Sequence, residues 1–316
     1  MTLLLLAAYA LVLFGSKYLA APELLRPDFA YTSPLWKLIF SSQIPSWLSG
    51  ILAVGLLLIQ ALIFNQLLYQ FKVIAPASTL AALFYVLTGI SLGAVFSPAL
   101  LGMTFILIAF YKLVNSYDRD QADLTLLDAG LWIGVASLFH VSFIFFLIFA
   151  WVGVLYLRNP SFRELMVISS GFVTAYALTF TIAYVFGDLF YFSVDHFRLG
   201  DSFGPYLELT AIYNKSAAFA MPFILGVIGI VFMQAKLGRS LIQIRKIYYL
   251  MLLTLLICLL IIIPIIDPRL TGLVAFALPI SFFIAYLVNY SGWKRSWELV
   301  HLVWFATIII LHWVSI

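Results

Sequence analysis

Two carboxylates stand in a short polar segment near the start of the chain. Glu23 and Asp28 lie between one apolar run and an aromatic-rich stretch. A carboxylate beside aromatic side chains, at a surface of reduced dielectric, has a raised pKa and can act as a general base near neutral pH. In the alternative interpretation the segment is a solvated loop, in which the acids cap helices and one of them pairs with Arg26.

Cationic groups gather later in the chain. Asp195, His196 and Arg198 fall within one turn if their segment is helical. An Arg fork with an imidazole beside it suits a phosphate or pyrophosphate group, although the same trio also forms a self-neutralising surface patch. Arg269 stands in a short turn between two apolar runs, where it either reaches the same cleft or marks the end of two helices.

The remaining polar groups do not form a recognisable metal or cofactor site. An acidic stretch lacks the glycine and closing Glu of an EF-hand, so we interpret it as a charged loop and helix start; it contains Asp118, Asp120, Asp123 and Asp128 around Arg119. His140 has no second His or acid one turn away. The single cysteine, Cys258, excludes a disulfide framework and a cysteine-based zinc site. We predict neither a metal nor a cofactor.

The composition decides which elements must position these residues. The chain has 316 residues, of which 65% are hydrophobic and 9% charged, against roughly 25% charged in a soluble domain. The apolar runs are long and continuous rather than alternating, which excludes an outer-membrane barrel. A net charge of +4 without a basic stripe argues against a nucleic-acid partner. The sequence predicts an all-α, polytopic transmembrane bundle.

Nine apolar runs are interpreted as membrane spans, which need about 20 residues and a little fewer where protein rather than lipid surrounds the helix. The first run lacks the basic start and cleavage site of a signal peptide, so we expect a retained helix. Leu35 to Phe40 is expected to lie in the interface, with Trp36 at the level of the lipid headgroups. The nine predicted spans are Thr2–Ala21, Leu48–Leu68, Pro76–Leu92, Pro98–Leu113, Leu165–Phe186, Ala217–Met233, Ile247–Ile266, Leu270–Val288 and Leu299–Trp313.

A tenth stretch, Leu126 to Leu157, leaves the topology open. Its 32 residues would extend about 48 Å as one helix, so it is either one strongly tilted helix or two short helices that turn near His140. Two helices give eleven spans with the N-terminus inside, and one helix gives ten with the N-terminus outside. Both place eleven of the 17 Lys and Arg residues in the cytoplasm, as the positive-inside rule requires.

The longest polar loop, residues 187–216, is expected on the outer face in both topologies. It holds an unusual density of ionisable groups, and long loops with their own chemistry are often functional. We therefore divide the chain into an N-terminal transmembrane module, residues 1–165, with a first outer loop at 22–47, and C-terminal transmembrane helices, residues 166–316.

Several motifs resemble the GT-C superfamily, the multi-pass glycosyltransferases that use polyprenyl-phosphate donors and include enzymes similar to protein O-mannosyltransferases. Pro27 to Tyr31 is similar to the acidic motif of their first outer loop. Ser97 to Leu101 and Ala129 to Phe139 are similar to a pair of their helices. The resemblance implies a break near His140 and a first loop on the outer side. The chain also resembles a group of uncharacterised bacterial multi-pass proteins.

Two positions depart from the GT-C pattern. Phe29 stands where many members have a second acid, and His140 stands where many have Lys. A degenerate, non-catalytic relative is therefore an alternative to an active enzyme.

The resemblance implies sugar transfer from a polyprenyl-phosphate donor at the outer face of a bacterial inner membrane. Asp28 or Glu23 would deprotonate the acceptor, and His196, Arg198 or Arg269 would bind the lipid phosphate. Expected partners are the polyprenyl-phosphate-linked sugar, membrane lipids and other membrane proteins. The alternatives are a non-catalytic subunit that scaffolds a membrane complex and, more weakly, a lipid or solute transporter.

Overall fold

All regular structure that the computed structural model describes is helical. It describes residues 2–20, 34–40, 44–74, 79–117, 122–158, 161–185, 216–262, 271–292 and 294–314. Five segments within these ranges are long and apolar enough to cross a membrane: Ser46–Gln70, Pro98–Asn115, Phe162–Val185, Ile242–Ile262 and Gly272–Tyr290. The expected all-α fold is confirmed.

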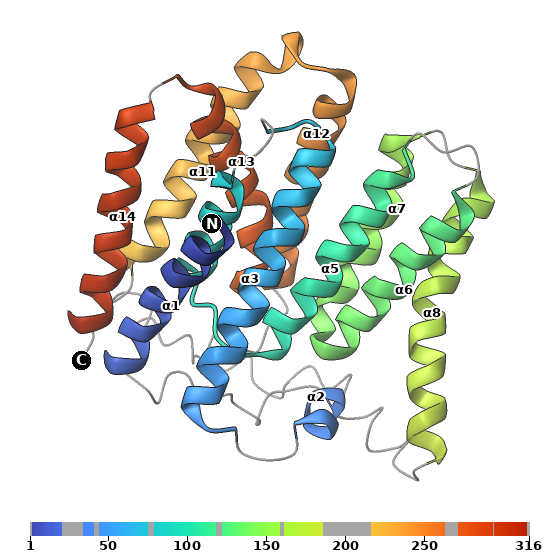
Figure 1. Ribbon diagram of the computed structural model, residues 1–316. Helices are drawn as coiled ribbons and strands as arrows, with labels where there is room; N and C mark the ends of the chain where they lie inside the picture. The colour runs from blue at the N-terminus through green and yellow to red at the C-terminus, as the bar shows by residue number, and fades with distance from the viewer. Residues whose placement is uncertain are drawn as a thin grey trace.

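Consecutive long helices run in opposite directions (Figure 1). The first half contains α1 (Thr2–Ala20), α2 (Pro34–Ile39), α3 (Ser46–Gln70), α4 (Leu80–Ser91), α5 (Pro98–Asn115), α6 (Asp123–Phe139), the 3-10 helix η2 (Val141–Phe145) and α7 (Phe146–Leu157). The second half contains α8 (Phe162–Val185), α11 (Ser216–Lys236), η3 (Leu237–Arg239), α12 (Ile242–Ile262), η4 (Thr271–Phe276), α13 (Ala277–Tyr290) and α14 (Lys294–Val314).

The long apolar stretch from Leu126 to Leu157 is broken at His140. α6 ends at Phe139, His140 has an extended backbone (φ −137°, ψ 104°), and η2 leads into α7. The backbone N–H of Phe143 donates to the carbonyl of His140 at 2.9 Å, which closes the turn. α6 and α7 therefore run antiparallel (Figure 1). The two-helix prediction is confirmed, and the single tilted helix is wrong.

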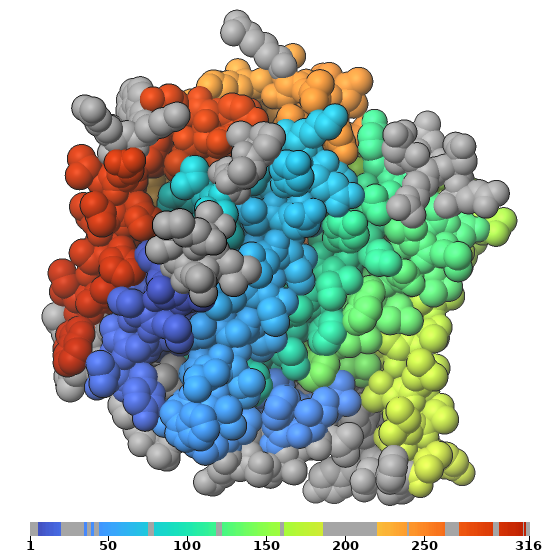
Figure 2. All heavy atoms as spheres, in the orientation of Figure 1, coloured from blue at the N-terminus to red at the C-terminus, as the bar shows by residue number. Residues whose placement is uncertain are grey.

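Glycines let α6 and α8 pack backbone against backbone. A Cβ added at Gly130 would lie 2.0 Å from the carbonyl oxygen of Ile168, and one at Gly171 would lie 2.2 Å from that of Leu127. Small residues at membrane helix contacts permit this close approach. The rest of α8 has few protein neighbours, and the helix stands at the margin of the molecule (Figure 2).

A buried amide joins three helices. Gln60 of α3 donates from Nε2 to the carbonyl of Leu100, at 2.6 Å, and to the hydroxyl of Thr104. Its Oε1 accepts a hydrogen bond of 3.0 Å from the hydroxyl of Tyr85 on α4. These bonds satisfy a polar side chain with no solvent exposure and fix the contact of α3, α4 and α5.

The first and last helices pack side by side. Tyr9 of α1 is hydrogen bonded to His301 of α14 at 2.9 Å. Trp304 of α14 donates to the hydroxyl of Ser91, the last residue of α4, at 2.9 Å. The two ends of the chain are therefore built into one wall of the bundle (Figure 1).

The short helix α2 forms as expected, and its tryptophan is buried among protein side chains. Trp36 has no solvent-exposed surface and packs against Phe40 and Phe96, with ring centroids 4.4 and 4.9 Å away. The indole is therefore buried in protein, because Phe40, which follows α2, and Phe96, which precedes α5, cover it.

Candidate functional site

The five residues predicted to form a site all lie outside the described residues. They are Glu23, Asp28, His196, Arg198 and Arg269. The flanking helix ends are described, and they share one end of the bundle: the C-termini of α1, α8 and α12 and the N-termini of α11 and η4 (Figure 1). The three segments that carry the predicted residues are thus attached at the same end, called the loop end below.

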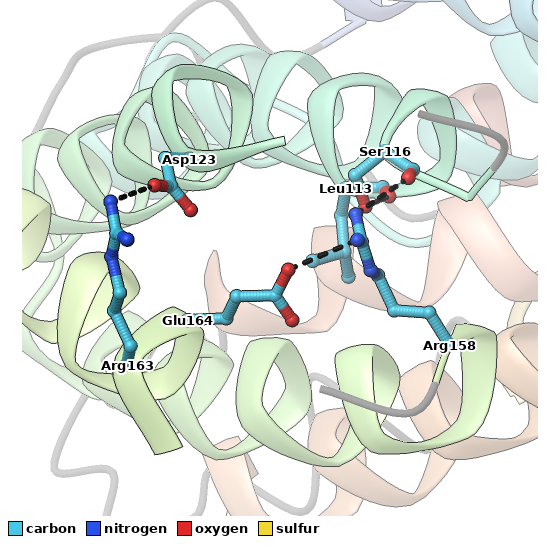
Figure 3. Close-up of polar contacts among 6 residues, drawn as sticks. All are labelled: Leu113, Ser116, Asp123, Arg158, Arg163 and Glu164. Carbon is cyan, nitrogen blue, oxygen red and sulfur yellow. Dashed lines mark hydrogen bonds and ion pairs between the residues drawn. The ribbon is translucent and has the colours of Figure 1, made fainter. Parts of the chain in front are cut away.

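At the opposite end, Arg158 connects three helices (Figure 3). It follows the last residue of α7 and donates from Nη1 to the carbonyl of Ser116, which follows α5, at 3.1 Å. Its Nη2 lies 3.0 Å from Oε1 of Glu164, in the first turn of α8. A cation at the C-terminus of one helix and an acid at the N-terminus of another both complement the helix dipoles.

Two further ion pairs lie at this end. Asp123, the first residue of α6, accepts from Arg163 of α8 at 2.6 Å (Figure 3). Asp128, little more than one turn later, accepts from Lys112 of α5 at 2.7 Å. The interpretation as a charge of the helix start is confirmed for Asp123, whereas Asp128 lies beyond the first turn of α6. Asp118 and Asp120 lie outside the described residues.

Lys246 ties α12 to the same group of helix ends. Its Nζ donates to the carbonyl of Leu157, the last residue of α7, at 2.5 Å. The same ammonium lies 4.3 Å above the ring of Tyr117, which follows α5. The side chain thus neutralises the partial negative charge at the C-terminus of α7.

The arrangement at this end holds helices together rather than presenting a reactive group. The cations named above meet an acid or a helix-terminal carbonyl, and Oε2 of the buried Glu164 has no hydrogen-bond partner among the described residues. Among those same residues, no three His, Cys, Asp or Glu side chains come together in a geometry that could hold a metal ion. The charged residues at this end of the bundle therefore have an electrostatic and structural role.

Lys17 is the charged residue at the loop end that the sequence interpretation missed. It is 8% exposed, in α1, and its Nζ lies 3.5 Å from the carbonyl of Ala94, which follows α4. The signal that could have identified it is a lysine inside an apolar run and close to an acidic segment. In surroundings of low dielectric, a buried ammonium interacts strongly with nearby anions. Lys17 therefore belongs among the candidate cations of the loop end.

A family model described as "Family of unknown function (DUF6427)" matches residues 37–316. The chain belongs to the DUF6427 family. The matched range includes the segments of His196, Arg198 and Arg269, and it begins after Glu23 and Asp28. No curated protein and no solved structure matches the chain. Membership of DUF6427 therefore assigns a family without assigning a reaction.

Proposed function

We propose that the chain crosses a bacterial inner membrane eleven times and transfers a sugar from a polyprenyl-phosphate donor at the outer face. The helix break at His140 supports an odd number of spans, because it adds one crossing before α8. The lysines and arginines at the end opposite the loop end support a cytoplasmic location for that end. The loop end is then extracytoplasmic.

The observation that carries the proposal is the common attachment of the three segments that contain the predicted residues. The segments with the acids, with His196 and Arg198, and with Arg269 join helix ends on one side of the bundle (Figure 1). A transfer site needs a base and a phosphate-binding cation within reach of the same substrate. Segments attached at opposite ends of the bundle could not bring both groups to one substrate.

The proposed step is an inverting transfer. The acceptor hydroxyl attacks the anomeric carbon while Asp28, with Glu23 as the second candidate, takes its proton. The bond between the anomeric carbon and the phosphate oxygen breaks, and its electron pair leaves with the polyprenyl phosphate. Arg198, Arg269 and His196 stabilise the charge of the departing phosphate. Neither a metal nor a cofactor is invoked in this step.

A gene deletion complemented with variants tests the proposal. Cells without the protein should lose one class of cell-envelope glycan and accumulate its lipid-linked sugar, both measured by mass spectrometry. The wild-type gene should restore the glycan, whereas D28N should not, at equal protein level in the membrane. Restoration of the glycan by a double variant that carries D28N and E23Q would contradict catalysis by these carboxylates.

A non-catalytic subunit of a membrane complex is the second candidate, and the surface of α8 favours it. Only 22% of an apolar 18-residue stretch of α8 is buried inside the protein, against 44% or more in the other four long segments. Its exposed side includes hydroxyl groups as well as apolar side chains, at Ser170, Thr174 and Thr181. A scaffold should tolerate D28N and fail when bulky residues replace Thr174 or Thr181.

A further inference from the structure

Two exposed tyrosines are in contact where α7 ends and α12 begins, and an arginine stands one turn before one of them. The rings of Tyr156 and Tyr249 are in edge contact, with centroids 5.4 Å apart, and the side chains are 43% and 42% exposed. Arg245 precedes Tyr249 by one helical turn on α12, and its side chain is exposed. These three residues are called the Arg245 cluster below.

The cluster stands on helix ends that are held together. The hydrogen bond from Lys246 to the carbonyl of Leu157 joins the first turns of α12 to the last residue of α7. Adjacent cations on α12 therefore have different uses: Lys246 turns inward and caps a helix, whereas Arg245 faces outward. The outward guanidinium is positioned by a fixed backbone.

Arg245 has no acidic partner in the part of the chain that the structure describes. Neither α7 nor α12 contains Asp or Glu. The described ion pairs join other cations to Asp123, Asp128 and Glu164. The exposed guanidinium fork of Arg245 therefore has no carboxylate beside it among the described residues, and its geometry suits phosphate oxygens.

An apolar seam continues from the cluster along both helices. On α7 the exposed side chains include Val152 and Leu155, and on α12 they include Leu256 and Leu259, each between 41% and 55% exposed. A cation and aromatic rings at the membrane interface, above exposed aliphatic side chains, match the headgroup and acyl chains of a phospholipid.

We propose that the Arg245 cluster binds the headgroup of an anionic glycerophospholipid of the phosphatidylglycerol type, with its acyl chains along the α7 and α12 seam. The guanidinium donates to the phosphate, and the hydroxyl of Tyr156 or Tyr249 donates to the same group. Charge favours lipid over a second copy, because a twofold contact at this seam would bring two Arg245 side chains together. The site is independent of the proposed sugar transfer.

Lipid binding to the purified full-length protein tests the assignment. Native mass spectrometry in detergent should show more phosphatidylglycerol than phosphatidylcholine bound to the wild type. R245Q should weaken phosphatidylglycerol binding about fivefold, the effect expected of one basic residue facing anionic lipid. R163Q is the matched control, because it removes an exposed arginine at the same end of the bundle but far along the chain from α12.

Thermal unfolding in the same detergent checks that each variant is folded before binding is measured. At the same lipid concentration, phosphatidylglycerol should raise the unfolding temperature of the wild type and R163Q more than that of R245Q. Equal losses in R163Q and R245Q would overturn the assignment in favour of a diffuse charge effect. Displacement of the lipid by millimolar inorganic phosphate would overturn it in favour of a free anion site.

Discussion

The side chain at position 60 shows how a single polar residue contributes to a membrane bundle. Gln60 is fully buried and exchanges hydrogen bonds with two neighbouring helices. Its replacement by Leu leaves the hydroxyl of Tyr85 without this acceptor. We expect Q60L to lower the free energy of unfolding by about 1 to 2 kcal/mol, the upper range for hydrogen bonds between membrane helices. Chemical unfolding of the protein in detergent measures this loss of stability.

Gln66 provides the control for that measurement, because it lies on the same helix and is exposed. Q66L should change the stability little. In a double-mutant cycle, Q60L and Y85F should be less than additive, since both remove the same hydrogen bond. Additive effects would show that the hydrogen bond contributes nothing of its own.

The two arginine pairs on α8 differ in burial and should differ in energy. The side chains of Arg158 and Glu164 are 18% and 11% exposed, whereas those of Arg163 and Asp123 are 78% and 41% exposed. R158M leaves a buried carboxylate without its cation, and we expect a loss of about 2 to 3 kcal/mol. R163M should cost less than about 1 kcal/mol. The same unfolding assay compares them, and equal losses would contradict the distinction.

Hydropathy predicted the helices better than their ends. The span expected from Ile247 begins at Ile242, because Arg245 and Lys246 break the apolar run but find positions compatible with a helix. The break at His140 left no decisive signal in hydropathy, since apolar residues flank it on both sides. Tertiary packing decides the break, because α5 and α8 pack on α6 and α12 packs on α7.

The candidate site could be predicted only in part, for a different reason. Residues such as Asp28 and Arg198 have chemical character, but their sequence surroundings have no periodicity that fixes their position. Lys17 was visible in the sequence as a charge in an apolar run, yet its burial against the segment after α4 depends on the contact of α1 and α4. Assigning these residues to one site stays a prediction.

The crossing of α6 and α8 is an element-scale contact that a single methyl group should disrupt. G171A would place a Cβ against the carbonyl of Leu127, which cannot move without shifting the helix. We expect a loss of about 1 to 3 kcal/mol, as for other overpacked contacts. G55A on α3 is the control, since a Cβ there meets nothing within 4 Å. A tolerated G171A would contradict the backbone contact.

At the scale of the whole molecule, the eleven-span topology makes a prediction about accessibility. Ser46 begins α3 at the loop end, whereas Thr79 precedes α4 and Ser161 precedes α8 at the other end. Single cysteines at these positions, in a C258A background, can be labelled with a membrane-impermeant maleimide in spheroplasts. S46C should react directly. T79C and S161C should react only after the membrane is opened.

The pair S46C and S161C separates the two topologies that charge alone allowed. Eleven spans place an odd number of crossings between positions 46 and 161, because α3, α4, α5, α6 and α7 each cross once. A tilted single crossing in place of α6 and α7 would make that number even and put both cysteines on one side. Labelling of both from the same side would therefore refute the topology and, with it, the extracytoplasmic location of a site that combines Asp28 and Arg198.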